Sequence, residues 1–208
     1  MRDLTLVLIA VGAWIAIGFL TAWWMARRGH RHPSWLFMGA VFGPVLALVA
    51  PMRVLRHPRR LARTETGPRR PGGLRVLVGV DGSAESLAAL DLATGLLGPY
   101  TESLVAAEVV GYDAAEDDWD GSTVAAKSRL NSAAERSGGR VASCEVLAGP
   151  PAQALARYAH EQRIDLIIVG RHGRGLSKRL LGNVAQELVR EGTVPVLVAG
   201  GRQNPSDR

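Results

Sequence analysis

The chain is poor in cysteine and in lysine, and each shortage excludes a class of protein. Cys144 is the one cysteine in 208 residues, so no disulfide can form within one chain, which excludes a disulfide-stapled secreted scaffold. Cys144 lies in a strand-like run, which favours a small buried residue over a nucleophile. The two lysines, Lys127 and Lys178, do not follow glycines, so a Walker A loop is excluded as well.

Acidic side chains are scarce in the first third of the chain. Residues 1–73 hold eleven arginines against Asp3 and Glu65, whereas residues 74–208 hold fourteen basic and seventeen acidic side chains. The isoelectric point of about 10.4 is therefore a property of the first third. This asymmetry argues against a globular domain that binds nucleic acid, and it favours a basic segment beside anionic membrane lipids. We expect no nucleic-acid partner.

Two long segments near the N-terminus lack charge. Residues 4–25 are 22 in number, enough to cross about 30 Å of hydrocarbon as a helix, and residues 35–52 add another 18. Trp23 and Trp35 flank the short basic loop between them, as aromatic residues do at a membrane interface. We therefore predict a transmembrane helical hairpin over residues 1–52. Two alternatives stay open: a cleaved signal peptide for the first segment, and an interfacial or re-entrant second segment.

Residues 53–73 mix arginine with proline and glycine and have no apolar period, which predicts a linker. The linker holds seven arginines against three in the preceding loop, which predicts that the following domain faces the cytoplasm at the inner membrane. Two compatible interpretations of the basic stretch stay open, a solvated topogenic tail and a clamp on anionic lipid. Residues 201–208 are predicted to form a flexible tail.

Short apolar runs alternate with helical patterns after the linker. The five runs cover residues 74–80, 104–110, 140–147, 166–169 and 194–199. Ser83 is a good N-cap for a helix that continues to about Leu96. Strands that alternate with helices imply right-handed crossovers and a parallel sheet with helices on both faces. The sequence thus predicts a five-stranded α/β domain over residues 74–200.

The fourth run ends in a glycine-rich turn. Gly170 and Gly173 follow the run at once, a helical pattern opens near Ser177, and Gly182 and Asn183 come after its start. Glycines let backbone N–H groups approach an anion closely, and a helix N-terminus adds about half a positive charge. Arg171 adds a full positive charge to the same turn. The turn therefore has the chemistry of a phosphate-binding loop.

These glycines and the ordered set of five runs resemble the universal stress protein family from about Leu74 to Gly200. The family's pattern is Gly, two residues, Gly, about nine residues, then Gly followed by Ser or Thr. In this chain the second spacing is eight residues, and Asn183 stands at the hydroxyl position. The resemblance implies the strand order 3-2-1-4-5, with a ligand at the carboxyl ends of strands one and four, where the winding reverses. It also implies a homodimer that pairs through the fifth strand.

The resemblance further implies an adenine-nucleotide site, with ATP as the ligand and Mg²⁺ as an optional companion. Asp81 corresponds to the acid near the ribose or a bound metal, and Val109 to the residue whose backbone contacts adenine. The positions that correspond to phosphate and ribose contacts are Gly170, His172, Gly173, Gly182, Asn183 and Val184. Two alternatives stay open: a turn-forming role for Asp81 and a core role for Val109. We assign no catalytic residue, and no metal site beyond Asp81.

Three functions are consistent with the sequence. The first is a membrane-anchored stress sensor or regulator whose cytoplasmic domain binds ATP. The second is a dimeric interaction module that binds no nucleotide and regulates a membrane partner. The third, a slow ATPase, is disfavoured because no histidine has a nucleophile beside it in sequence. The complete set of motif glycines favours the first function, and the shortened loop favours the second.

Overall fold

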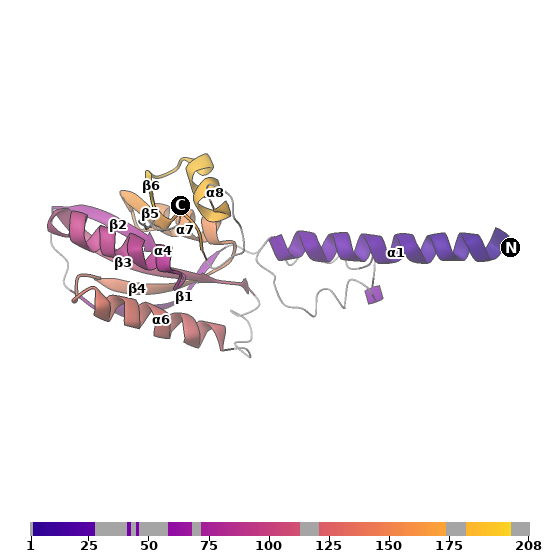
Figure 1. Cartoon of the computed structure of the whole chain (residues 1–208), viewed down its shortest axis with the longest axis horizontal. Helices are drawn as coiled ribbons and strands as arrows, with labels where there is room; N and C mark the ends of the chain where they lie inside the picture. Colours follow the sequence, from indigo (N-terminus) through magenta and orange to yellow (C-terminus); the bar gives the residue numbers. More distant parts are fainter. Residues whose placement is uncertain are drawn as a thin grey trace, which may run out of the picture.

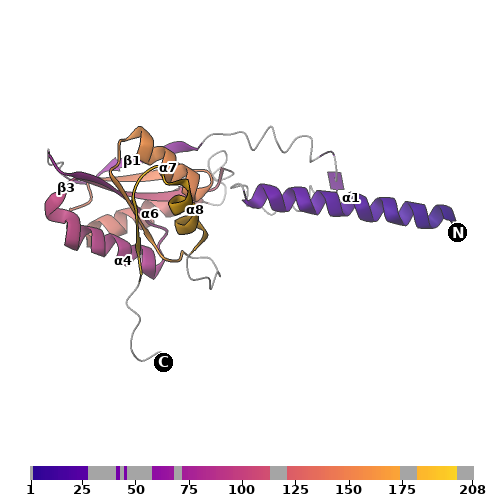
Figure 2. The same cartoon turned by 90° about the horizontal axis from the view of Figure 1, so that it is seen from above.

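The structure, a computed structural model, describes residues 2–27, 41–42, 45, 58–67, 72–112, 121–173 and 182–200. A long N-terminal helix, α1 (Arg2–Arg27), extends away from an α/β domain in both views (Figures 1 and 2). The predicted tail at residues 201–208 lies outside the described residues, as do residues 174–181, where the sequence predicts the start of the helix after the glycine turn.

The domain is built on one six-stranded sheet with the order β1-β4-β3-β2-β5-β6. The strands are β1 (Arg59–Glu65), β2 (Leu74–Gly79), β3 (Thr101–Val110), β4 (Ser143–Ala148), β5 (Leu166–Gly170) and β6 (Val196–Ala199). The five strands from β2 onward are parallel, in the order that the family resemblance implies. β1 pairs with β4 in the antiparallel sense, so the sheet is mixed.

β1 corrects the sequence prediction, which assigned its residues to a linker and counted five strands. The sequence did not predict this strand, because it is rich in arginine and Leu61 is its only large apolar residue. The ladder nevertheless runs from Arg59 opposite Ala148 to Glu65 opposite Ser143, with a bulge after Arg60. Leu61 packs against the core of the domain, so the outer edge of β4 is covered by the chain's own N-terminal segment.

Helices cover both faces of the sheet, as predicted. Helices α4 (Ala84–Leu92) and α6 (Ser122–Arg136) pack on one face, and α7 (Pro151–Glu161) and α8 (Asn183–Glu191) pack on the other. Successive side chains of β2 alternate between the two cores because a strand has a period of two. Val76 and Val78 are fully buried under α4 and α6, and Leu77 is fully buried under α7.

The predicted helix from Ser83 to about Leu96 forms in two parts. The hydroxyl of Ser83 accepts a hydrogen bond from the backbone N–H of Ser86 at 3.2 Å, which confirms the predicted N-cap of α4. Beyond Leu92 the helix continues as a π-helix, η1 (Ala93–Leu97), and then as a 3₁₀ turn, η2 (Gly98–Tyr100).

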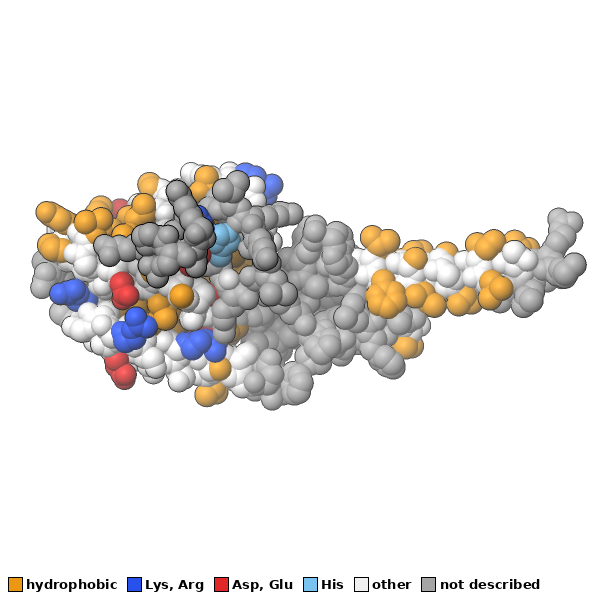
Figure 3. Space-filling model, in the orientation of Figure 1, with side chains coloured by type: hydrophobic (Ala, Val, Ile, Leu, Met, Phe, Trp, Pro, Cys, Tyr) orange, Lys and Arg blue, Asp and Glu red, His pale blue; other side chains and the backbone are white. Residues whose placement is uncertain are grey.

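The first uncharged segment forms α1, and its apolar side chains are exposed (Figure 3). Leu6, Ile9 and Leu20 are each more than 60% exposed. Within the described ranges, however, no helix is long and apolar enough to cross a membrane, so the structure does not support the predicted transmembrane hairpin. The second segment is described only at residues 41–42 and 45. There the carbonyl of Val41 accepts a hydrogen bond from Nε1 of Trp14 in α1.

Candidate functional site

A cavity of about 480 Å³ lies at the carboxyl ends of β2, β3 and β5. The winding of the sheet reverses between β2 and β5, because the helices that follow them, α4 and α8, pack on opposite faces. A doubly wound sheet leaves a crevice at such a point, and ligands of this fold class bind there. The cavity therefore lies where the topology alone would place a ligand.

The structure brings all eight predicted site residues to this cavity. Its lining includes Asp81, Val109, Gly170, His172, Gly173, Gly182, Asn183 and Val184. They converge because the carboxyl ends of parallel strands meet at one edge of the sheet. Their proximity is a structural fact, and their contact with a ligand stays a prediction.

Part of the cavity lining is apolar, which suits a flat apolar group such as a nucleobase. Val109 and Val169 come from strand ends, while Pro151 and Leu155 come from the first turns of α7. The two α7 residues were not among the predicted site residues. Their position just after the carboxyl end of a strand was the available signal.

The glycine turn also lines the cavity, and its glycines contribute backbone atoms rather than side chains. A Cβ on Gly173 would lie 2.5 Å from Oδ2 of Asp81, and one on Gly182 would lie 2.8 Å from the carbonyl oxygen of Arg171. The N–H of Gly182 donates to that same carbonyl at 2.8 Å and closes the loop. Side chains are therefore excluded at both glycines, and both residues line the cavity without one.

Asp81 serves the local turn and faces the cavity at the same time. Its Oδ1 accepts a hydrogen bond from the N–H of Ser83 at 3.0 Å, which is the turn-forming role left open above. Its Oδ2 lies directly against Gly173, and Asp81 also lines the cavity. The two roles are compatible, because each uses a different oxygen.

Gly82 and Arg129 are in close contact next to Asp81, in the turn that follows β2. Gly82 has a φ of +81°, and a Cβ on it would lie 2.9 Å from Cδ of Arg129 in α6. Nε of Arg129 donates to both carboxylate oxygens of Glu108 at 3.1 Å, and this hydrogen bonding raises the pKa of Arg129. Arg129 thus packs against the turn as one partner of a structural ion pair.

Glu85, in the first turn of α4, contacts the glycine turn and was not among the predicted site residues. Its Oε2 accepts a short hydrogen bond from the backbone N–H of His172, and Nδ1 of His172 lies 3.2 Å from both carboxylate oxygens. The close approach depends on Gly170, where a Cβ would lie 2.9 Å from the backbone of Glu85 and Ser86. Glu85 therefore fixes the start of the turn relative to α4.

The side chain of Arg171 has a buried donor that an anionic ligand could satisfy. Its Nε is buried, and within the described ranges it has no hydrogen-bond partner. A buried donor without an acceptor is costly, and a phosphate oxygen would satisfy it. Opposing this, Asp81 brings a carboxylate to the same cavity. Within the described residues no group of three or more His, Cys, Asp or Glu could hold a metal ion.

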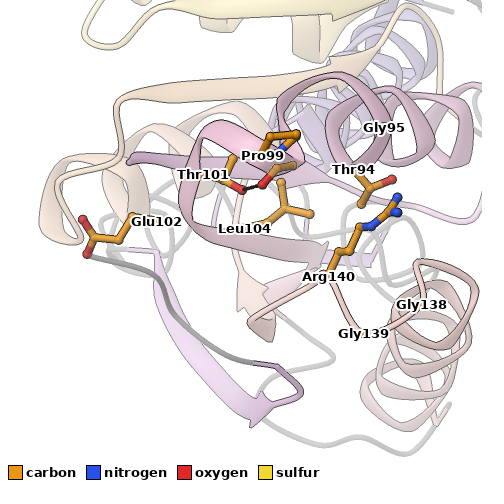
Figure 4. Close-up of a pocket in the computed structure, with 10 residues that line it drawn as sticks. Thr94, Gly95, Pro99, Thr101, Glu102, Leu104, Gly138, Gly139 and Arg140 are labelled. Atoms are coloured by element: carbon orange, nitrogen blue, oxygen red, sulfur yellow. Dashed lines mark hydrogen bonds between the residues drawn. The ribbon is translucent and has the colours of Figure 1, made fainter. Parts of the chain in front are cut away.

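A second cavity, also of about 480 Å³, lies at the amino-terminal end of β3 (Figure 4). It is lined by Thr94 of η1, by Thr101 and Glu102 at the start of β3, and by Arg140. The hydroxyl of Thr101 donates to the carbonyl of Gly98 at 3.0 Å. None of the predicted site residues lines this cavity, so the candidate site is the one at the carboxyl ends.

A doubly wound parallel sheet with a glycine turn at its switch point defines a class of α/β protein that binds ligands at this edge. Comparison with known families is consistent with this class, because the profile of the universal stress protein family matches residues 74–200. The match covers more than half of the chain. The chain belongs to the universal stress protein family.

Relatives with curated names carry the same family name. The universal stress proteins Mb2019 of Mycobacterium bovis and Rv1996 of Mycobacterium tuberculosis are each 31% identical to this chain over 185 residues, which cover 81% of the chain and 57% of each relative. Universal stress protein MJ0531 of Methanocaldococcus jannaschii is 40% identical over 55 residues, 26% of the chain and 32% of that protein. The chain thus spans less than two thirds of the length of the relatives it matches.

The fold is also that of a solved structure. The hypothetical protein MJ0577 aligns with a TM-score of 0.55 at 20% identity, over 63% of this chain and 98% of that one. A universal stress protein crystallised in complex with cAMP aligns with a TM-score of 0.49 at 29% identity, over 62% of this chain and 97% of that one.

Proposed function

We propose that the domain binds an adenine nucleotide, with ATP as the first ligand to test, and acts as a regulator in a stress response. The base would lie against the apolar wall formed by Val109 and Leu155. The phosphates would lie at the glycine turn and the N-terminus of α8. The proposal includes no catalytic step.

One observation carries this proposal: the eight residues that the family motif predicts line a single cavity at the switch point of the sheet. The unsatisfied buried Nε of Arg171 supports it, because it supplies a donor where the phosphates would lie. The N-terminus of α8 contributes to the same place, since Gly182 is its N-cap and no side chain of the described residues caps it.

Calorimetry with the full-length protein and ATP tests the proposal. Wild type should bind, and Gly173→Val should abolish binding, because a side chain there collides with Asp81 and holds the phosphate away from the backbone. Gly95→Ala is the matched control, since nothing lies within 4 Å of a Cβ at that position. Equal binding by wild type and Gly173→Val would remove the site assignment.

The interaction module is the second candidate function, and two observations favour it. The loop between Gly173 and Gly182 is one residue shorter than the family pattern, and Asp81 places a carboxylate beside it. Both features weaken phosphate binding. No heat from wild type at millimolar ATP would leave this function in place of the first.

We also propose a homodimer that pairs through β6, as the family resemblance implies. β6 is the last strand of the described sheet, and Leu197 is 36% exposed on it. Edges of this kind are usually paired or covered. Light scattering should give twice the monomer mass at tens of micromolar, and Val196→Lys should give monomers. A monomeric wild type would contradict the proposal.

Attachment to the cytoplasmic membrane is a further proposal, carried by the exposed apolar side chains of α1. Such a surface needs an apolar environment, and the arginine-rich segment that follows suits anionic lipid. The full-length protein should stay with membranes after carbonate washing. A protease outside sealed cells should not reach a tag at the C-terminus. Release by carbonate would contradict the attachment. Digestion of the tag would contradict its orientation.

A further inference from the structure

β1 belongs to the folded domain, although it precedes the residues that define the family. The family match begins at Leu74, and β1 ends at Glu65. Beyond the ladder with β4, the hydroxyl of Thr66 donates to the carbonyl of Val141 at 2.7 Å. The N-terminal segment is therefore attached to the sheet along the whole length of β4.

Two arginines of β1 pair with a carboxylate that the fold buries completely. Glu145 in β4 is 0% exposed. Its Oε2 lies 3.1 Å from Nε of Arg60, and its Oε1 lies 3.5 Å from Nε of Arg63. A buried charge that loses its partners is strongly destabilising. Docking of β1 and burial of Glu145 are thus a single event.

The same carboxylate contacts α7. The hydroxyl of Tyr158 donates to Oε1 of Glu145 at 3.1 Å, and the guanidinium of Arg60 lies 5.1 Å from the centre of the Tyr158 ring. Burial, followed by the nearby charge of Glu145, raises the pKa of the Tyr158 hydroxyl, so it stays protonated and can donate. Arg60, Glu145 and Tyr158 form one cluster between β1, β4 and α7.

Helix α7 joins this cluster to the candidate site. Tyr158 lies one turn after Leu155, and Leu155 and Pro151 form part of the apolar wall of the site cavity. Residues three apart lie on the same face of a helix. A displacement of this face of α7 at Tyr158 therefore also displaces Leu155. The first residue of β1, Arg59, lies opposite Ala148, three residues before α7 begins.

We propose that Arg60 is a positioning residue for the nucleotide site, acting through Glu145, Tyr158 and α7, so that docking of the N-terminal segment and binding of nucleotide favour each other. The proposal rests on the proposed function. Coupling of this kind is reciprocal. Undocking of β1 lowers nucleotide affinity, and bound nucleotide stabilises docked β1.

The first measurement is the ATP affinity of full-length variants. Arg60→Gln should weaken binding about fivefold, at the low end of ordinary coupling between sites. Arg136→Gln, which removes an exposed arginine that pairs with Asp91 at 3.6 Å, is the matched control and should bind like wild type. In a Glu145→Gln background, Arg60→Gln should change the affinity less than twofold, because the buried charge it compensates is gone.

The second measurement is amide hydrogen exchange of the wild-type protein with and without ATP. If Arg60 had only a structural role, ATP would not change the exchange rates in β1. ATP should slow exchange in β1 more than in α6, which packs on the opposite face of the sheet from α7. This readout decides the matter if Arg60→Gln fails to fold.

The outcomes separate the two proposals. If wild type binds ATP but Arg60→Gln binds equally well, or if β1 is slowed no more than α6, the positioning role is wrong and the nucleotide site stands. If wild type binds no ATP, the proposed function fails and the positioning role fails with it.

Discussion

Nδ1 of His172 lies 3.2 Å from the carboxylate of Glu85, although 87 positions separate the two residues in the chain. The backbone N–H of His172 donates to the same carboxylate. One acid in the first turn of α4 therefore holds both the backbone and the side chain of the residue that begins the glycine turn. The turn is fixed from outside as well as by its own glycines.

Glu85→Ala should weaken ATP binding about tenfold, because the turn loses a hydrogen bond to a charged group, worth about 1.5 kcal/mol. Glu85→Gln should retain most of the affinity, since an amide oxygen can still accept from the N–H of His172. Calorimetry on both variants checks this. Wild-type affinity in Glu85→Ala would show that the contact with His172 does not organise the site.

Asn183→Ala should cost about 1 kcal/mol of nucleotide binding, the value of one ordinary hydrogen bond. Asn183 is the first residue of α8 and lines the cavity. Asn183→Ser restores the hydroxyl of the family pattern and should retain binding. The affinities of the two variants relative to wild type test the assignment, and an Asn183→Ser variant weaker than Asn183→Ala would refute it.

Removal of residues 1–73 should destabilise the domain by about 3–5 kcal/mol, because Glu145 loses both arginines of β1 and β4 loses its antiparallel partner. Removal of residues 1–57 is the matched control. It leaves β1 in place and should change the free energy of unfolding little. Urea unfolding of both truncated proteins measures the difference. Equal midpoints would mean that β1 contributes no stability.

Cys144 should resist alkylation in the native protein at neutral pH. Burial raises the pKa of its thiol from 9.0 to about 11, and the thiolate is the reactive form. The unfolded chain ionises near pH 9 and the folded one near pH 11, so the stabilising contribution is complete below pH 9 and decreases as the pH rises to 11. Mass spectrometry after iodoacetamide treatment measures the labelling. Rapid labelling at pH 7.5 without denaturant would contradict the prediction.

Much of the fold followed from local patterns. The apolar runs that became β2, β5 and β6 are short and rich in Val, Leu and Ile, which is typical of buried parallel strands. Asp81 and Val109 reached the same cavity as Gly173 because each follows or ends such a strand, and the family resemblance supplied the strand order. These features depend on residues near one another in sequence, or on topology.

The features that were missed depend on contacts between distant parts of the chain. β1 contains four charged residues among its seven, and its partner Glu145 gives no local sign that it will be buried. From the sequence, Glu85 is an ordinary acid in the first turn of a helix. Its contact with His172 appears only in the folded domain. No local pattern predicts an ion pair that forms only after the sheet is assembled.

The direction of β1 decides at which edge of the sheet the chain enters the domain. An antiparallel strand beside β4 begins at the carboxyl edge of the parallel sheet, since Arg59 lies opposite Ala148. The chain therefore enters the domain from the same edge at which the cavity lies. Anything that displaces the start of β1 therefore acts at the edge of the sheet that holds the cavity.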